Sequence, residues 1–202
     1  MKLYFSPGAC SLAPHIVLRE AGYDFSLEQV DLKEHKLKAG GGDYYAINPK
    51  GSVPLIELDN GQRVTEIPAI TQYLADQKPA AGLAPANGSF ERVRLQEWMN
   101  FIASEIHKQF GPLFRPTTPD AFKEILKENL GKRFDWLQKE LAGKQFLMGD
   151  KYTIADAYLF TVLRWTVPVN IDVSRWPGLK AYMDRVAARP KVAEALKAEG
   201  LK

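Results

Sequence analysis

The stretch KLYFSPGACSLAPHIVLREAGYDFSLEQV, residues 2–30, decides the fold class of this chain. Residues 2–6 predict a strand, and the Pro-Gly pair that follows predicts a turn. Residues 10–20 carry apolar side chains at helical spacing and end at an Ala-Gly pair. Residues 25–30 alternate between apolar and polar side chains and predict a second strand. A strand–helix–strand unit of this kind favours two parallel strands joined by a helical crossover.

The following residues complete a small α/β domain. Residues 33–45 are polar and glycine-rich, and they predict a loop, either alone or with a short helix in it. Residues 53–58 and 62–65 flank an Asn-Gly turn and predict a hairpin of two short strands. A helix is expected at 68–76, where a proline opens the first turn. The first domain is therefore placed at residues 1–78.

After this domain the pattern becomes helical. Residues 79–88 are rich in Pro, Gly and Ala and predict a linker. The rest of the chain, 89–202, has apolar stripes at helical spacing, most clearly at 90–110 and 121–141. A capping-box pattern at 153–156 predicts the start of another helix. The expected fold class is an α/β domain followed by an all-α domain.

Composition and charge argue against several classes of protein. The chain has 202 residues, 46% of them hydrophobic and 25% charged, as is typical of soluble globular proteins. No apolar run approaches the length that crosses a bilayer, and the first residues lack the pattern of a signal peptide. The net charge of +3 comes from interspersed acids and bases, so no nucleic-acid or membrane partner is expected. A single cysteine, Cys10, excludes an intramolecular disulfide and favours a cytoplasmic location, and no metal site is expected.

Cys10 follows a strand and a turn, at the start of the first predicted helix. A helix start presents unpaired N–H groups and the positive end of the macrodipole, so we expect the pKa of this thiol to be lowered. The alternative is a buried structural cysteine, which is the commoner state of a lone cysteine. The neighbouring residues Ser11, Leu12 and Ala13 offer no second thiol, so disulfide chemistry would need a thiol from another molecule.

A polar set lies on the long helix after the linker. Asn100, Ser104, His107 and Lys108 have the spacing that places side chains on one face, opposite the apolar stripe. The outer face of any amphipathic helix is polar, and periodicity alone favours this structural interpretation.

A third group precedes the helix expected at 68–76. Val53 and Pro54 stand where a strand begins, and a proline there removes a hydrogen bond from the ladder. Glu66 and Ile67 come directly before the helix, which places a carboxylate beside free backbone N–H groups. Such a pair suits the ammonium and carboxylate of an amino acid. A glutamate at this place is also commonly a simple partner for the helix dipole.

Taken in order, these segments resemble the cytosolic glutathione transferases. The matching segments are residues 10–11, 48–54, 58–61 and 65–66 in the first domain and residues 105–108, 112–114 and 153–158 in the second. Cys10, together with His107 and Lys108, is similar to the bacterial beta class of that family. The resemblance implies a thioredoxin-like glutathione-binding domain, a helical-bundle domain that forms the electrophile pocket, and a homodimer.

The resemblance also implies a glutathione site in the first domain. Val53, before an expected cis Pro54, would hydrogen-bond the cysteinyl backbone of glutathione as an added strand does. Glu66 and the N–H of Ile67 would hold the γ-glutamyl end. Cys10 would lie beside the glutathione sulfur, where it could hydrogen-bond the thiolate or form a mixed disulfide.

The helical domain is implied to complete this site. Ser104, His107 and Lys108 would face the same cleft, where His107 could donate a hydrogen bond to the ligand's sulfur. Asn100 belongs to the region that reaches the partner subunit in related enzymes. The resemblance therefore favours a functional interpretation of this helix face over the structural one.

Two positions differ from the wider family, and a third stays open. Ile67 stands where serine is common, so only its backbone N–H can bind the ligand. No tyrosine of the first strand is placed to supply a catalytic hydroxyl, which leaves Ser11 as the expected spare hydroxyl. Either His35 or Lys36 would approach the glycyl carboxylate, and the sequence does not choose between them.

The expected function is the conjugation of reduced glutathione to small hydrophobic electrophiles, with glutathione as co-substrate and no other cofactor. The site would keep the sulfur ionised and hold it near the electrophile. The side chains expected to shape the electrophile pocket are Tyr4, Phe110, Trp165 and Thr166. One alternative is a glutathione-dependent thiol–disulfide or peroxide reductase that uses Cys10 through a mixed disulfide. The other is a non-catalytic ligand-binding or interaction module.

Overall fold

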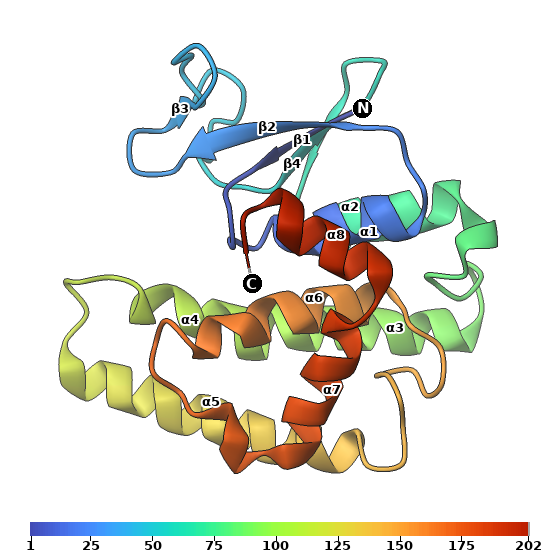
Figure 1. Cartoon of the computed structure of the whole chain (residues 1–202), viewed down its shortest axis with the longest axis vertical. Helices are drawn as coiled ribbons and strands as arrows, with labels where there is room; N and C mark the ends of the chain where they lie inside the picture. The colour runs from blue at the N-terminus through green and yellow to red at the C-terminus, as the bar shows by residue number, and fades with distance from the viewer. Residues whose placement is uncertain (202) are drawn as a thin grey trace. The chain divides into compact units, whose positions relative to one another are not determined.

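The computed structural model describes residues 1–201 and divides the chain into two units (Figure 1). The first unit comprises Met1–Ala84 together with Arg189–Lys202, and the second comprises Pro85–Ala188. Lys202, the last residue of the expected helical domain, lies outside the described residues. The units differ from the expected division at 78 and 89 mainly because the last helix groups with the first unit. Within residues 1–201, no helix combines the length and the apolar character needed to cross a membrane.

The first unit contains one mixed sheet of five strands in the order β3-β2-β1-β4-β5. Its strands are β1 (Lys2–Phe5), β2 (Ser26–Asp31), β3 (Lys36–Leu37), β4 (Leu55–Glu57) and β5 (Arg63–Thr65). β1 and β2 run parallel and are joined through helix α1 (Leu12–Glu20), whereas β4 and β5 form an antiparallel hairpin. The predicted strand–helix–strand unit and the predicted hairpin are both confirmed.

One strand was not predicted. The polar segment 33–45 contains the two-residue strand β3, which pairs antiparallel with the end of β2. A strand this short carries no alternating pattern, so periodicity does not reveal it. Pairing of Asp31 with Lys36 and of Val30 with Leu37 holds the loop against the edge of the sheet.

Both faces of the sheet are covered by packed side chains. On one face Tyr4 packs in a buried cluster with Val30, Tyr44, Val53 and Leu55. On the other face lie α1, whose residues 12–18 are all buried, and helices α2 (Ile67–Gln77) and α8 (Pro190–Ala198). Figure 1 shows α8 lying beside α1, and the contacts between these two helices are among the most extensive in the unit.

A series of linked hydrogen bonds explains why the last helix belongs to this unit. Glu199, just after α8, places one carboxylate oxygen 2.8 Å from His15 Nδ1 and accepts the Gly8 N–H at 2.9 Å with the other. Both side chains are fully buried. Arg19 Nε, which can only donate, lies 2.9 Å from His15 Nε2, so the imidazole proton is on Nδ1 and is donated to Glu199. The turn before Cys10 is thereby tied to residue 199.

The second unit is helical. Its helices are α3 (Phe90–Phe101), a π-helical segment (Ile102–His107), α4 (Lys108–Leu113), α5 (Asp120–Glu140), α6 (Ile154–Leu163) and α7 (Pro177–Ala187). Short 3-10 turns span Arg164–Thr166 and Val173–Arg175, and another, Pro79–Ala81, lies in the first unit. The apolar stripe predicted for 90–110 is buried, and the capping box at the start of α6 is confirmed. The π-helical segment was not predicted; it widens the turn just before His107.

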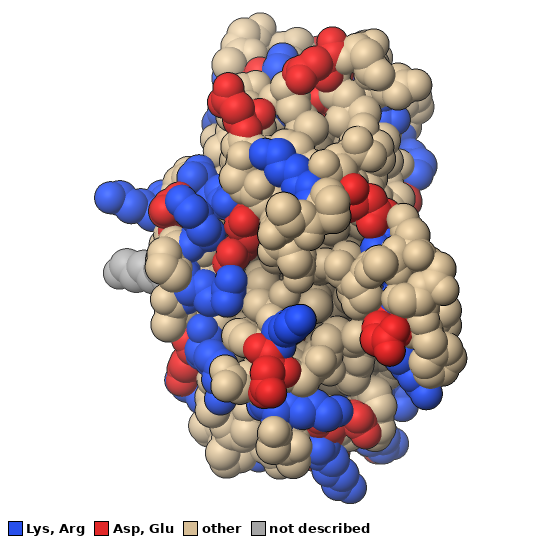
Figure 2. Space-filling view, turned by 90° about the vertical axis from the view of Figure 1, so that its right-hand side faces the viewer, with Lys and Arg blue, Asp and Glu red and all other residues tan. Residues whose placement is uncertain are grey.

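Charged side chains are mixed over the visible surface. On the face shown in Figure 2, Lys and Arg lie interspersed with Asp and Glu. This agrees with the small net charge of +3.

Candidate functional site

Cys10 and Val53 come together in the first unit. Cys10 lies in the turn before α1, with Ser11 as the residue that precedes the first helical position. The Cys10 thiol lies 3.1 Å from the Val53 carbonyl oxygen, to which it donates. The peptide bond from Val53 to Pro54 is cis, as the sequence led us to expect. Residues 43 positions apart therefore meet at one end of the sheet.

The expected lowering of the Cys10 pKa is wrong. Burial raises the pKa of this thiol to about 12. Hydrogen bonds from the backbone at Cys10 and Ser11 favour the thiolate but do not outweigh its loss of solvation, and the negative charge of Glu66 disfavours it further. Cys10 is only partly buried as a residue, yet desolvation is the largest influence on the pKa of its thiol. At neutral pH Cys10 is therefore a neutral thiol, able to donate a hydrogen bond.

Ser11 does not present a spare hydroxyl. Its side chain is fully buried. The hydroxyl accepts the Ser6 N–H at 3.1 Å and lies 3.3 Å from the Ser6 carbonyl oxygen, to which it donates. These two bonds close the loop between β1 and α1, so Ser11 shapes the Cys10 turn and its hydroxyl is already engaged.

Glu66 stands at the start of α2 in a strained backbone conformation. Its φ of 70° is rare for a residue with a side chain, and such strain gathers at functional sites. The carboxylate is 69% exposed and lies 2.8 Å from Lys50 Nζ. Ile67 begins the helix, at a position whose N–H has no acceptor within the helix itself. A carboxylate and helix N–H groups thus lie side by side, as predicted.

Lys50 belongs to this group, although it was not singled out from the sequence. Its ammonium donates to Thr65 Oγ1 at 3.0 Å as well as to Glu66. The available signal was its place three residues before Val53, in the segment 48–54 that carries the family resemblance. A lysine there brings a positive charge to the carboxylate that would bind an amino-acid end.

His35 and Lys36, the two candidates for binding the glycyl carboxylate, lie in different surroundings. His35 Nδ1 lies 3.1 Å from the Gly51 carbonyl oxygen, and its ring stacks on Tyr45 with centroids 4.4 Å apart. Gly51 has a φ of +65°, and a Cβ atom there would meet the Tyr45 ring at 2.5 Å, so only glycine fits. Lys36 is an exposed residue of the edge strand β3. Of the two, His35 is the one held next to the segment that leads to Val53.

In the second unit, His107 lies in an aromatic cluster. His107 Nδ1 is 2.6 Å from the Tyr158 hydroxyl, and its ring meets the edges of Tyr158 and Trp165. Trp165 also contacts Phe110 and Phe114. Tyr158 was not singled out from the sequence, because it sits within the apolar helix α6, where an aromatic residue is most simply explained as core.

The other predicted residues of this unit lie differently. Asn100, Ser104 and Lys108 are exposed, and Ser104 Oγ donates to the Asn100 carbonyl oxygen at 3.0 Å. Thr166, expected in the electrophile pocket, is fully buried and donates to the Leu163 carbonyl oxygen at 2.7 Å. Tyr4, expected in the same pocket, packs in the core of the first unit.

Comparison with known proteins places this geometry in a family. The family model for the glutathione S-transferase amino-terminal domain matches residues 8–77, and the model for the carboxy-terminal domain of that family matches residues 101–190. Glutathione S-transferase GstA of Escherichia coli O157:H7 is 48% identical, over the full length of both chains.

Two solved structures are similar along their whole length. A sphingomonad glutathione S-transferase complexed with glutathione has 50% identity and a TM-score of 0.95, covering all of both chains. A beta-class glutathione S-transferase from Sphingomonas chungbukensis has 48% identity and a TM-score of 0.96, again covering all of both chains.

The chain therefore belongs to the glutathione S-transferase superfamily, in its bacterial beta class. It is an enzyme, a glutathione transferase, with the thioredoxin-like amino-terminal fold and the helical carboxy-terminal fold of that superfamily.

Proposed function

We propose that this enzyme conjugates glutathione to small hydrophobic electrophiles, with the tripeptide bound on the first unit through Val53, Glu66 and Ile67. The observation that carries the proposal is the meeting of the Cys10 thiol with the Val53 carbonyl beside a cis proline. A relative with 50% identity was solved with glutathione bound, which supports this choice of ligand.

Each part of glutathione has a matching group on this unit. The Val53 backbone would pair with the cysteinyl residue in the manner of an added strand. The exposed Glu66 carboxylate would take the α-ammonium group, and the Ile67 N–H would take the α-carboxylate. Lys50 already neutralises Glu66 and would remain beside the same end. We assign the glycyl carboxylate to His35, held next to Gly51, in preference to Lys36.

The role of Cys10 follows from its raised pKa. A neutral thiol can donate to the glutathione sulfur and so stabilise the glutathione thiolate, whereas a nucleophilic or disulfide-forming cysteine must first ionise. A few such hydrogen bonds lower the pKa of a bound thiol by roughly one to three units. We therefore favour conjugation over the reductase that would use Cys10 through a mixed disulfide.

Replacing Cys10 with alanine is expected to lower kcat/KM for conjugation by about tenfold, because a hydrogen bond from the neutral thiol to the glutathione thiolate is charge-assisted and contributes about 1.5 kcal/mol. The measurement is conjugation of 1-chloro-2,4-dinitrobenzene at pH 7. As a companion test, iodoacetamide should alkylate Cys10 of the ligand-free enzyme slowly at pH 7, with a rate that still rises at pH 9. A loss of more than a hundredfold, together with fast alkylation at pH 7, would favour the reductase mechanism.

We assign the electrophile to the aromatic cluster of the second unit, with His107 as the donor to the sulfur and with Ser104 and Lys108 as supporting polar groups. The rings around Trp165 offer an apolar wall of the kind small hydrophobic substrates need. The Tyr158 hydroxyl holds the imidazole in one orientation.

Replacing Tyr158 with phenylalanine is therefore expected to lower kcat by about fivefold with little change in the glutathione KM, since it frees the His107 ring without touching the tripeptide. Steady-state kinetics with both substrates varied will measure this. The matched control is Tyr182→Phe, because the hydroxyl that it removes bonds Asp156 and not His107. At a temperature at which this variant is folded, its kcat should equal that of the parent. Equal losses of kcat in both variants would show a merely structural role for Tyr158.

The overall proposal is tested by calorimetry and by assay together. Glutathione should bind with one site per chain, and the dinitrobenzene conjugate should accumulate at a rate that saturates in both substrates. Binding without turnover of any of a panel of aryl halides, epoxides and enals would favour a ligand-binding module.

We also propose that the enzyme is a homodimer in which the region of Asn100 reaches the partner, and that it works in the cytoplasm, where its thiol stays reduced. Light scattering at micromolar concentration tests the dimer.

A further inference from the structure

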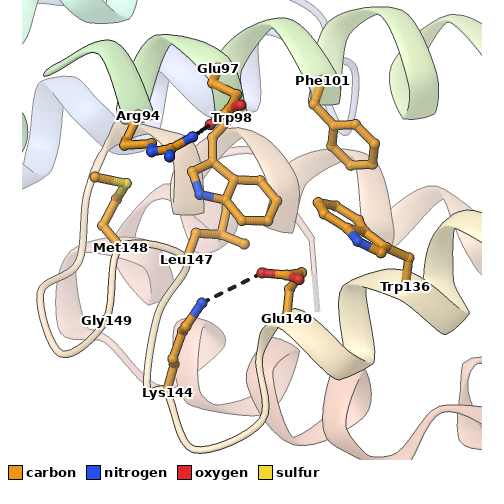
Figure 3. A pocket seen from close by; sticks show the side chains of 10 residues that line it. All are labelled: Arg94, Glu97, Trp98, Phe101, Trp136, Glu140, Lys144, Leu147, Met148 and Gly149. Atoms are coloured by element: carbon orange, nitrogen blue, oxygen red, sulfur yellow. Dashed lines mark hydrogen bonds and ion pairs between the residues drawn. The ribbon is translucent and has the colours of Figure 1, made fainter. Parts of the chain in front are cut away.

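Partly exposed aromatic rings also lie outside the cluster assigned to the electrophile. In the second unit, Trp98 and Phe101 of α3 pack against Trp136 of α5 (Figure 3). Trp98 and Phe101 flank Asn100 in the sequence, on the stretch of α3 that we assign to the partner subunit, so the proposed homodimer accounts for these rings. In the first unit, Tyr45 is 46% exposed and lies in the loop between β3 and β4. Neither the glutathione contacts nor the partner subunit accounts for Tyr45.

Tyr45 packs against His35, the residue to which we assign the glycyl carboxylate of glutathione. The two ring centroids lie 4.4 Å apart, and the ring planes are inclined by 30°. A separation this short is close to that of an offset stack, in which each ring restricts how far the other can tilt or rotate. The Tyr45 ring therefore limits the orientations that the His35 imidazole can adopt.

Gly51 holds the same imidazole from a second side. His35 Nδ1 lies 3.1 Å from the Gly51 carbonyl oxygen and donates to it, because a carbonyl oxygen can only accept. A Cβ atom at Gly51 would come within 2.5 Å of the Tyr45 ring and 3.0 Å of His35 Nδ1. Both rings therefore lie directly against the backbone of Gly51, and the imidazole is fixed by a stack on its face and a hydrogen bond at its edge.

The backbone between the two stacked residues closes on itself and brings Tyr45 back to His35. Lys36 and Asp43 form an antiparallel β-bridge. The Tyr44 N–H donates to the His35 carbonyl oxygen at 2.8 Å. The Asp43 carboxylate accepts the Tyr45 N–H at 3.0 Å, which fixes the turn that leads into Tyr45. His35 itself has a φ of 50°, a conformation that is rare for a residue with a side chain and that gathers at functional sites.

The second ring nitrogen of His35 is left for a ligand. Within residues 1–201, Nε2 of His35 has no hydrogen-bond partner. This nitrogen can hold a carboxylate only when it carries a proton, and the negative charge of such a ligand favours the imidazolium form. A carboxamide in the same place carries no charge and gains less from the contact. A fixed imidazole therefore distinguishes a peptide with a free terminal carboxylate from one with a neutral terminus.

We propose that Tyr45 determines the specificity of the enzyme for a thiol peptide with a free terminal carboxylate, by fixing the His35 imidazole in the orientation that binds this group. Tyr45 is a positioning residue, because it acts through His35 and not on the reacting atoms. This role rests on the proposed function, in which glutathione binds on the first unit, and it adds the ring that selects among peptides that share the same sulfur.

The test compares glutathione with its glycyl amide as co-substrates of the full-length enzyme, in conjugation of 1-chloro-2,4-dinitrobenzene at pH 6.5. For the parent, KM should be about 20-fold lower for glutathione than for the amide. Tyr45→Ala should raise the KM for glutathione by about tenfold and leave the KM for the amide unchanged, so that the preference falls to about twofold. Its kcat should change by less than about threefold. Tyr45→Phe keeps the ring and should keep the preference of the parent.

A double-mutant cycle shows whether Tyr45 acts through His35, and it gives a second test that does not depend on the alanine variant alone. His35→Gln keeps a donor for the Gly51 carbonyl but cannot become a cation, so it should lose the preference with Tyr45 in place. Adding Tyr45→Ala to this variant should change the preference no further, whereas independent effects would add.

Phe122→Ala is the matched control for Tyr45→Ala. Phe122 is a similarly exposed aromatic (45%) on α5 in the second unit, and its replacement should leave the preference of the parent unchanged.

Three results would overturn this role of Tyr45. They are a parent enzyme that uses both peptides equally well, an alanine variant in which both KM values rise in parallel, and a further loss of preference when Tyr45→Ala is added to His35→Gln. Failure of the proposed function has a different signature, because the parent would then neither bind nor turn over glutathione, and the role of Tyr45 would be overturned with it.

Discussion

Replacing Glu66 with glutamine is expected to raise the glutathione KM by about 30-fold while changing kcat by less than threefold. The carboxylate is the negative charge offered to the tripeptide's ammonium group, and charge-assisted hydrogen bonds contribute about twice as much as neutral ones. The amide has the same shape but no charge, so only the ionic part of the contact is lost. Because Glu66 is 69% exposed, the free energy of unfolding should hardly change.

The control for this experiment is Glu57→Gln. Glu57 lies on β4 of the same sheet and pairs with Arg63 at 2.7 Å, so the substitution removes a comparable ion pair away from α2. Its glutathione KM should match that of the parent. Steady-state kinetics with glutathione varied at a saturating electrophile concentration distinguishes the two. An unchanged KM in the Glu66 variant would mean that the tripeptide's amino-acid end lies elsewhere, and the proposed binding mode would be abandoned.

The second large effect concerns stability, and it lies in the helical unit. Asp156→Ala is expected to lower the free energy of unfolding by about 4 kcal/mol at pH 7. The fully buried carboxylate accepts hydrogen bonds from Thr153 N at 2.8 Å, Leu147 N at 2.9 Å and the Tyr182 hydroxyl at 3.0 Å. Alanine would leave these donors buried without a partner and remove the capping box of α6.

Urea unfolding followed by circular dichroism measures this loss. Asp172→Ala is the matched control, because Asp172 also caps a helical turn, through Ser174 N at 2.9 Å, but is solvent-exposed. It should cost about 1 kcal/mol or less. Similar losses in the two variants would show that burial of the Asp156 network adds nothing to an ordinary cap.

The pH dependence of the same residue has a definite sign. Burial raises the pKa of Asp156 to about 6, against the hydrogen bonds that favour its ionised form. The folded state therefore binds the proton of the Asp156 carboxyl more tightly than the unfolded state does. For this reason the contribution of Asp156 titration to the free energy of unfolding is largest at low pH and is lost as the pH rises through about 6. The stability gap between the parent and Asp156→Asn, which cannot titrate, should therefore widen by about 1 kcal/mol between pH 7 and pH 5. A gap that narrows over this range would contradict the raised pKa.

Local pattern predicted most of the fold because the decisive signals are short-range. The parallel unit at 2–30, the Asn-Gly hairpin and the capping box at 153–156 are each encoded within a few residues. What pattern missed depends on partners distant in the chain. Strand β3 exists because the end of β2 is there to pair with it, and α8 joins the first unit because Glu199 bonds Gly8 and His15.

The candidate site was also predicted where its signals are local and missed where they depend on contacts between distant residues. Residue type and spacing pointed to Cys10, Val53 and Glu66, and the family resemblance pointed to His107. The pKa of Cys10, however, depends on how completely its thiol is desolvated, which no helix-start argument can supply. Ser11 was misjudged because its hydroxyl is engaged by Ser6, across a turn whose geometry the sequence does not give. Tyr158 is identified only when folding brings it to His107. Lys50 had a signal in the sequence, its place in the segment 48–54, but its contact with Glu66 is what identifies it.

The tie between Gly8 and Glu199 has a consequence for biosynthesis. The turn that holds Cys10 is completed by a residue 191 positions later, so the first unit cannot finish folding while the ribosome is still making the second. At translation rates of about 5–20 residues per second, the intervening helical unit delays that closure by about 5–20 s. During this interval the turn that holds Cys10 lacks its contact with Glu199. The first unit is therefore the first to be synthesised and the last to complete its folding.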